Sequence, residues 1–102
     1  MDIFLKDNIF IFKIKTDLTA TTIKGLLINI KNQIDEYKEY EGIEINLEEV
    51  KSIDSMGITF LIGIYKIVNK ENKKFKLTGV SEAMLKLFKT MKLHEIVEIE
   101  KA

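Results

Sequence analysis

The residues best suited to do chemistry stand in one short stretch, Ser52-Ile53-Asp54-Ser55-Met56-Gly57-Ile58. An apolar segment of strand length precedes this stretch, and a largely apolar segment of helical length follows it. Asp54 and Ser55 are therefore predicted at the start of a helix, where such side chains cap free backbone N–H groups and contribute about 1 kcal/mol. The same position presents Ser55 at the edge of a sheet where functional groups collect, so the hydroxyl is a candidate control point.

Other signs of catalysis are few. His94 is the only histidine, and a serine nucleophile would need the fold to bring that distant residue to Ser55. The glycines form no phosphate-binding fingerprint, and no His, Cys or carboxylate set has metal-ligand spacing. We therefore expect no catalytic, cofactor-binding or metal-binding residues and a binding protein rather than an enzyme, with a small serine hydrolase as an alternative.

The composition bounds the partners and the compartment. The 102 residues include 16 basic and 16 acidic side chains, so the formal net charge is zero, and every basic residue is lysine. Without arginine or a positive field, direct nucleic-acid binding is not expected. There is no cysteine, and no apolar run approaches the roughly 20 residues of a membrane span. Residues 1–7 are too short and too acidic for a signal peptide, so none is expected. The composition predicts one domain over residues 1–102 in the cytoplasm.

Hydrophobic periodicity predicts alternating strands and helices. An opening hairpin precedes a regular alternation, which favours an α/β fold with a mixed, mostly parallel sheet of four to five strands and helices packed against it. Seven acidic residues between Asp35 and Glu49 are read as a solvated helix end and loop, or alternatively as an acidic lip beside Ser55. The predicted elements are a hairpin of residues 3–5 and 9–14, helices over 21–40, 54–68 and 81–91, and strands over 43–47, 75–80 and 93–99.

The segment Leu47 to Lys66, centred on Asp54-Ser55-Met56-Gly57-Ile58, resembles the signature of STAS domains, and in particular of bacterial anti-sigma factor antagonists. The resemblance extends to chain length, element order, the pair Asp17-Leu18 and the segment Ser81 to Phe88. The usual motif of that family is Asp-Ser-Ser-Gly, and its first serine, matched here by Ser55, is phosphorylated by the partner kinase. Met56 replaces the second serine, and Thr19 stands where the family often has aspartate.

The resemblance implies a STAS-like domain that binds an anti-sigma factor serine kinase and frees a sigma factor. Phosphorylation of Ser55 would switch the protein off, and a PP2C-type phosphatase would reset it. In an alternative, the chain is a STAS subunit of another cytoplasmic assembly, such as a stress-signalling scaffold or a lipid-transport ABC complex, and Ser55 is a structural helix cap. A small ligand and dimerisation through an edge strand also stay open. The partner-binding residues implied are Asp17, Thr19, Asp54, Ser55, Met56, Gly57 and Ile58.

Overall fold

The computed structural model describes residues 1–102 and has the element order β-β-α-β-α-β-α-β. One sheet holds the strands in the order β1-β2-β3-β4-β5, and only the β1–β2 pair is antiparallel. The predicted mixed, mostly parallel α/β sheet is confirmed. The strands are β1 (Asp2–Lys6), β2 (Ile9–Lys13), β3 (Gly42–Asn46), β4 (Lys74–Val80) and β5 (Glu98–Lys101), and the helices are α1 (Ile23–Glu36), α2 (Ser55–Lys70) and α3 (Glu82–Thr90).

The opening hairpin is closed by Asp7 and Asn8. Both residues have positive φ, 51° and 64°, as a two-residue turn of type I′ requires. Asp and Asn tolerate this left-handed backbone better than other side chains, and the turn matches the natural twist of paired strands. The predicted hairpin of residues 3–5 and 9–14 is confirmed, and it places β1 at the edge of the sheet.

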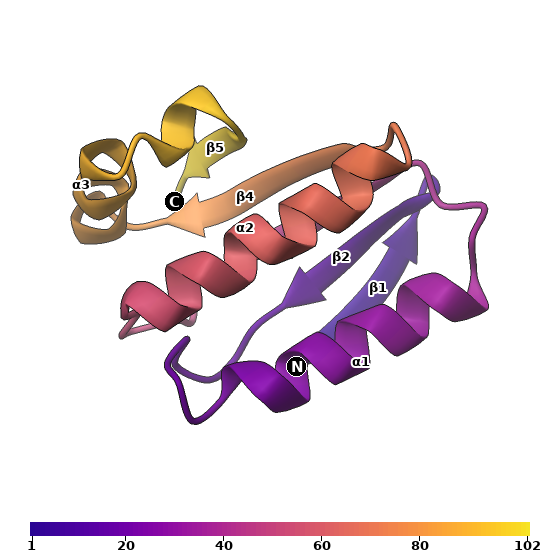
Figure 1. Ribbon diagram of the computed structural model, residues 1–102, viewed down its shortest axis with the longest axis horizontal. Helices are drawn as coiled ribbons and strands as arrows, with labels where there is room; N and C mark the ends of the chain where they lie inside the picture. The colour runs from indigo at the N-terminus through magenta and orange to yellow at the C-terminus, as the bar shows by residue number, and fades with distance from the viewer.

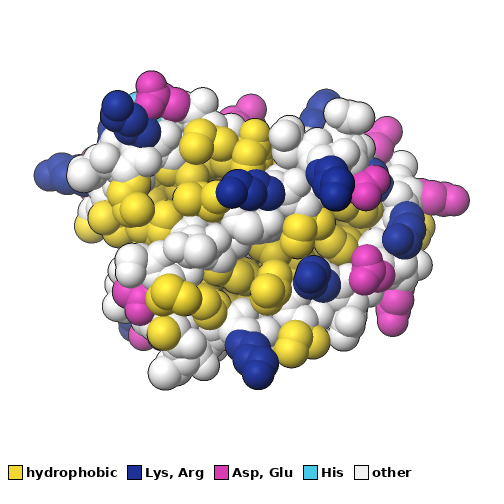
Figure 2. All heavy atoms as spheres, in the orientation of Figure 1, with side chains coloured by type: hydrophobic (Ala, Val, Ile, Leu, Met, Phe, Trp, Pro, Cys, Tyr) yellow, Lys and Arg dark blue, Asp and Glu magenta, His cyan; other side chains and the backbone are white.

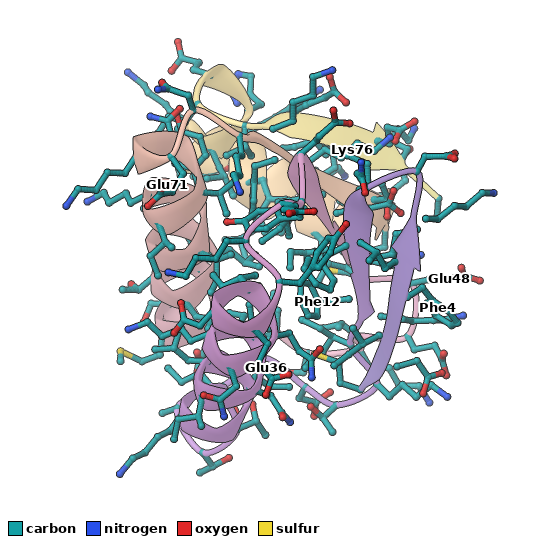
Figure 3. All side chains as sticks on the ribbon, turned by 90° about the vertical axis from the view of Figure 1, so that its right-hand side faces the viewer. Phe4, Phe12, Glu36, Glu48, Glu71 and Lys76 are labelled. Atoms are coloured by element: carbon teal, nitrogen blue, oxygen red, sulfur yellow. The ribbon has the colours of Figure 1, made fainter.

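The helices cover one face of the sheet. Figure 1 shows α1 and α2 lying side by side across the strands, and Phe12, Ile45 and Leu77 on that face are fully buried. Side chains alternate along a strand, so their neighbours point the other way. Figure 3 shows Phe12 between sheet and helices and Phe4 on the opposite side. On that open face Lys76 pairs with Glu100 at 2.8 Å, and this hydrogen bond raises the pKa of Lys76.

Helix α1 is shorter than the periodicity predicts, because it ends at Glu36 and not near Tyr40. The backbone leaves the helix at Tyr37, and the Glu41 N–H donates to the Asn8 carbonyl at 2.7 Å. Tyr40 is buried against Phe10, with ring centroids 5.6 Å apart, and burial raises the pKa of its phenol. Tyr40 is therefore a core residue of the connection to β3 and not the last turn of a helix.

The last strand also begins later than the predicted residue 93. A 3₁₀ turn, η1 (Leu93–Glu95), comes first, after Lys92 with a left-handed φ of 59°. Leu93 and Val97 are buried, and the chain pairs with β4 only from Glu98 onward. The burial of Leu93 and Val97 in the core bends the chain into the 3₁₀ turn, so β5 begins only at Glu98. No helix of this fold combines the length and apolar character that crossing a membrane requires.

Candidate functional site

Two loops meet at the edge of the sheet where β2 and β3 end. Residues 14–22 connect β2 to α1, and residues 47–54 connect β3 to α2. Because β2 and β3 are parallel, both loops leave from the same edge, and Figure 1 shows α1 and α2 starting there. The Leu18 N–H donates to the Ser52 carbonyl at 2.9 Å, and the Asp54 N–H donates to the Leu18 carbonyl at 3.1 Å. This single parallel bridge joins the loops.

Asp54 caps α2 and also holds the other loop. Its Oδ1 accepts a hydrogen bond from the Gly57 N–H at 2.9 Å, as an N-cap side chain does. Its Oδ2 accepts from the Ala20 N–H at 3.3 Å. The expectation that Ser55 is the structural cap of α2 is therefore wrong, because the N-cap is the neighbouring Asp54.

Ser55 is the first residue of α2, and its side chain is exposed. The hydroxyl makes no hydrogen bond within the protein, and neither the Ser55 nor the Met56 backbone N–H has an acceptor there. The Ser55 carbonyl is inside the helix and also accepts from the Thr59 hydroxyl at 3.0 Å. The fold therefore presents a free hydroxyl at the positively polarised end of a buried helix.

Gly57 and Ile58 lie beneath this surface, so their prediction as partner contacts needs correction. Ile58 is 1% exposed and belongs to the core, whereas Met56 is 46% exposed. A Cβ built on Gly57 would stand 2.2 Å from the Leu18 carbonyl oxygen and 2.8 Å from the Ile53 Cγ1. Only glycine lets the start of α2 approach the bridge this closely. Gly57 and Ile58 support the site and do not face a partner.

The Thr22 hydroxyl holds the β2–α1 loop, a role that the Asp54-Ser55-Met56-Gly57 motif does not indicate. The Thr22 Oγ1 accepts from the Thr19 N–H at 3.1 Å and donates to the Asp17 carbonyl at 2.5 Å. Asp17 is exposed and Thr19 is half-buried. Both belong to the loop whose Leu18 carbonyl accepts the Asp54 N–H. Leu18, Ala20 and Thr22 were missed as site residues. Leu18 and Ala20 act through backbone atoms, for which a sequence gives no signal.

The acidic lip does not form beside Ser55. Glu49 pairs with Lys13 of β2 at 3.4 Å. The backbone of Glu48 lies against Gly79 of β4, where a Cβ would stand 2.9 Å from the Glu48 nitrogen. Figure 3 shows Glu48 on the side of the sheet away from the helices. His94 lies in η1, beside α3 and β5, and not in either loop of the site. No cluster of three or more His, Cys, Asp or Glu side chains could hold a metal ion.

Removing the Asp54 side chain tests this geometry. We expect Asp54→Ala to lower the free energy of unfolding by about 1–2 kcal/mol, because the Gly57 and Ala20 N–H groups both lose an acceptor. Ser55→Ala, the matched control one residue away, should change it by less than about 0.5 kcal/mol. Urea unfolding followed by circular dichroism measures both. Equal losses in the two variants would contradict the assignment of the cap.

Comparison with known proteins gives a consistent result. The STAS domain model matches residues 2–102. The anti-sigma-B factor antagonist of Listeria monocytogenes is 32% identical over 73 residues, which are 70% of this chain and 64% of that protein, and so less than two thirds of its length. The anti-sigma-B factor antagonist of Bacillus subtilis is 28% identical over 85 residues, covering 71% of this chain and 78% of that protein. A Thermotoga maritima protein whose crystal structure is described as that of a putative anti-sigma factor antagonist has the same fold, with a TM-score of 0.86 at 23% identity over 99% of this chain and 86% of that one.

Proposed function

This chain belongs to the STAS domain family, and from that premise we propose that it is an anti-sigma factor antagonist controlled at Ser55. In this role the unmodified protein binds an anti-sigma factor that is itself a serine kinase, and the bound sigma factor is released. It acts in the cytoplasm as a binding module and not as an enzyme. The partner contacts Ser55 and Met56 at the start of α2, together with Asp17, Thr19 and Asp54 around it.

One observation carries the proposal: the Ser55 hydroxyl is exposed and has no structural task. Asp54 is the N-cap of α2, so the fold gains nothing from a serine at position 55. A kinase can approach a hydroxyl at the outer end of a helix without opening the core. The bridge between Leu18 and Ile53 holds the backbone at the start of α2, so the Ser55 side chain is presented from a fixed backbone position.

The chemistry of the switch is phosphoryl transfer from ATP. A bond forms between the Ser55 Oγ and the γ-phosphorus, the bond to the leaving ADP oxygen breaks, and a base of the kinase takes the hydroxyl proton. The product carries about −1.5 to −2 charges. The free N–H groups of Ser55 and Met56 favour an anion at this helix end, so the fold tolerates the phosphate. The partner surface, in contrast, must now accept a bulky dianion. Hydrolysis by a PP2C-type phosphatase restores the hydroxyl.

Phosphorylation with site mapping tests this proposal. The protein is incubated with ATP and the anti-sigma kinase encoded in the same genome, and the modified residue is located by mass spectrometry. We expect one phosphate, on Ser55, and none on Ser55→Ala. Ser81→Ala is the control, because Ser81 also starts a helix but its Oγ accepts the Met84 N–H at 3.2 Å. A phosphate at another residue, or none from a kinase that modifies a different antagonist, would refute the role of Ser55.

A further inference from the structure

A groove runs along the outer surface between α1 and α2, away from the two loops. Its volume is about 370 Å³, and we call it the α1–α2 groove. Figure 2 shows apolar atoms exposed along this seam, with lysine side chains beside it. Met56 stands at one end, one residue after Ser55, so the groove continues directly from the proposed switch. Its apolar wall is formed by Ile23 and Leu27 of α1 and by Met56, Phe60 and Ile67 of α2.

The charge of the groove has one sign. Lys24 and Lys31 of α1 line it, both are exposed, and neither takes part in an ion pair. No acidic side chain lines the groove. The two lysines are seven residues apart, so they lie on one side of α1 with about 10 Å of helix axis between them. The groove therefore favours an occupant with an apolar stripe and negative charges along its flank.

We propose that the α1–α2 groove binds an acidic amphipathic helix of another protein. From Met56 to Ile67 the groove extends over about 16 Å of helix axis, which is the length of three helical turns. Helices commonly dock in such grooves through apolar residues at positions i, i+3, i+4 and i+7. A second copy of this chain is a poorer occupant, because a two-fold contact would bring Lys24 and Lys31 of both copies together.

Phosphorylation of Ser55 would regulate the binding of a helix in the α1–α2 groove. Ser55 does not line the groove, but it immediately precedes Met56, which does. A phosphate on Ser55 would therefore add negative charge near this part of the groove and repel an acidic helix bound there. This part of the inference rests on the proposed function, whereas the groove and its charge do not. The same modification would then weaken two contacts, one at the loops and one in the groove.

The groove contains a glycine that allows a clean test. A Cβ built on Gly63 of α2 has no atom within 4 Å, so a larger side chain there would fill the groove without disturbing the core. Gly25 of α1 is also a helical glycine with no atom within 4 Å, but it lies outside the groove. Gly63→Leu and Gly25→Leu are therefore a matched pair. Both should fold, because leucine is a better helix former than glycine.

The probe is a designed helical peptide of about 14 residues with leucines at i, i+3, i+4, i+7 and i+11 and glutamates on both flanks. It is titrated into the 15N-labelled full chain, and amide shifts are followed by NMR. We expect saturable shifts at Leu27, Thr59 and Gly63 with a Kd of about 1 mM or tighter. Gly63→Leu should weaken binding at least tenfold, and Gly25→Leu should leave it unchanged. Ser55→Asp should weaken it several-fold.

The charge is tested by reversal. A peptide with lysines in place of the glutamates should bind wild type at least tenfold more weakly, and the double variant Lys24→Glu with Lys31→Glu should reverse that preference. Equal binding of both peptides, no saturable shift in the groove, or equal effects of the two glycine variants would overturn the inference. Groove shifts on concentrating the free protein would assign the groove to a second copy, and shifts with anionic phospholipid vesicles but not with the peptide would assign it to a membrane. Because no kinase is present, these outcomes are independent of phosphorylation at Ser55.

Discussion

Ser55→Asp is expected to bind the anti-sigma factor about 100-fold more weakly than wild type, a loss of about 2.7 kcal/mol. Ser55→Ala should bind within a few-fold of wild type, because the hydroxyl has no hydrogen bond to lose within the protein. The carboxylate must give up its hydration when the partner covers the start of α2, and an unpaired charge at an interface costs several kcal/mol. The neighbouring Asp54 carboxylate adds repulsion of like charges.

Isothermal titration calorimetry without ATP measures these affinities and prevents phosphorylation during the experiment. Asn29→Asp is the control for charge alone, because Asn29 is an exposed residue of α1 outside both the loops and the groove. It should bind as wild type does. A thermal melt should show Ser55→Asp to be folded, since an acidic residue at a helix start is favourable. Wild-type affinity in Ser55→Asp would refute the electrostatic switch, whatever the phosphorylation experiment shows.

The sequence predicts the order of elements because each has its own periodicity. Phe10 and Phe12 alternate with the half-buried Ile9, Ile11 and Lys13. The residues that follow a helical spacing are Ile23, Leu26, Leu27 and Ile30. Both patterns are local, so they are visible without the fold. The end of α1 is not local, because it depends on the Asn8 carbonyl and on the packing of Tyr40 against Phe10. The early turn at Leu93 is decided in the same way by the core.

The sequence predicts the site only in part, because contacts between distant segments decide which side chain caps α2. Asp and Ser both make good caps, so the pair Asp54-Ser55 does not say which side chain takes the N–H groups. The Ala20 N–H decides it, and Ala20 is 34 residues away in the chain. Helix α2 is apolar on most of its circumference, so periodicity could not separate the buried Ile58 from the exposed Met56. Contacts between distant segments therefore leave the Ser55 hydroxyl without a hydrogen bond in the protein.

Gly57→Ala should be the most destabilising small substitution at the site, lowering the free energy of unfolding by about 3 kcal/mol. The new methyl group would overlap the Leu18 carbonyl oxygen at 2.2 Å and the Leu18 Cβ at 2.9 Å, and neither backbone nor Cβ can turn aside. For a domain of this size such a loss lowers Tm by more than about 10 °C. Urea unfolding and a thermal melt, both followed by circular dichroism, measure it.

Gly63→Ala provides the matched control for Gly57→Ala, because both replace a glycine of α2 by alanine. With no atom within 4 Å of its Cβ, Gly63→Ala should stabilise the protein by up to about 1 kcal/mol through helix propensity. The opposite signs would show that the overlap with Leu18, and not a general effect of alanine, decides the result. The Leu18 carbonyl also accepts the Asp54 N–H, so moving it separates the two loops and turns the start of α2. Gly57→Ala should therefore slow phosphorylation of Ser55 even at temperatures where the variant is folded. A variant as stable as wild type would mean that the bridge between the loops is free to shift, and the rigid presentation of Ser55 would then have no basis.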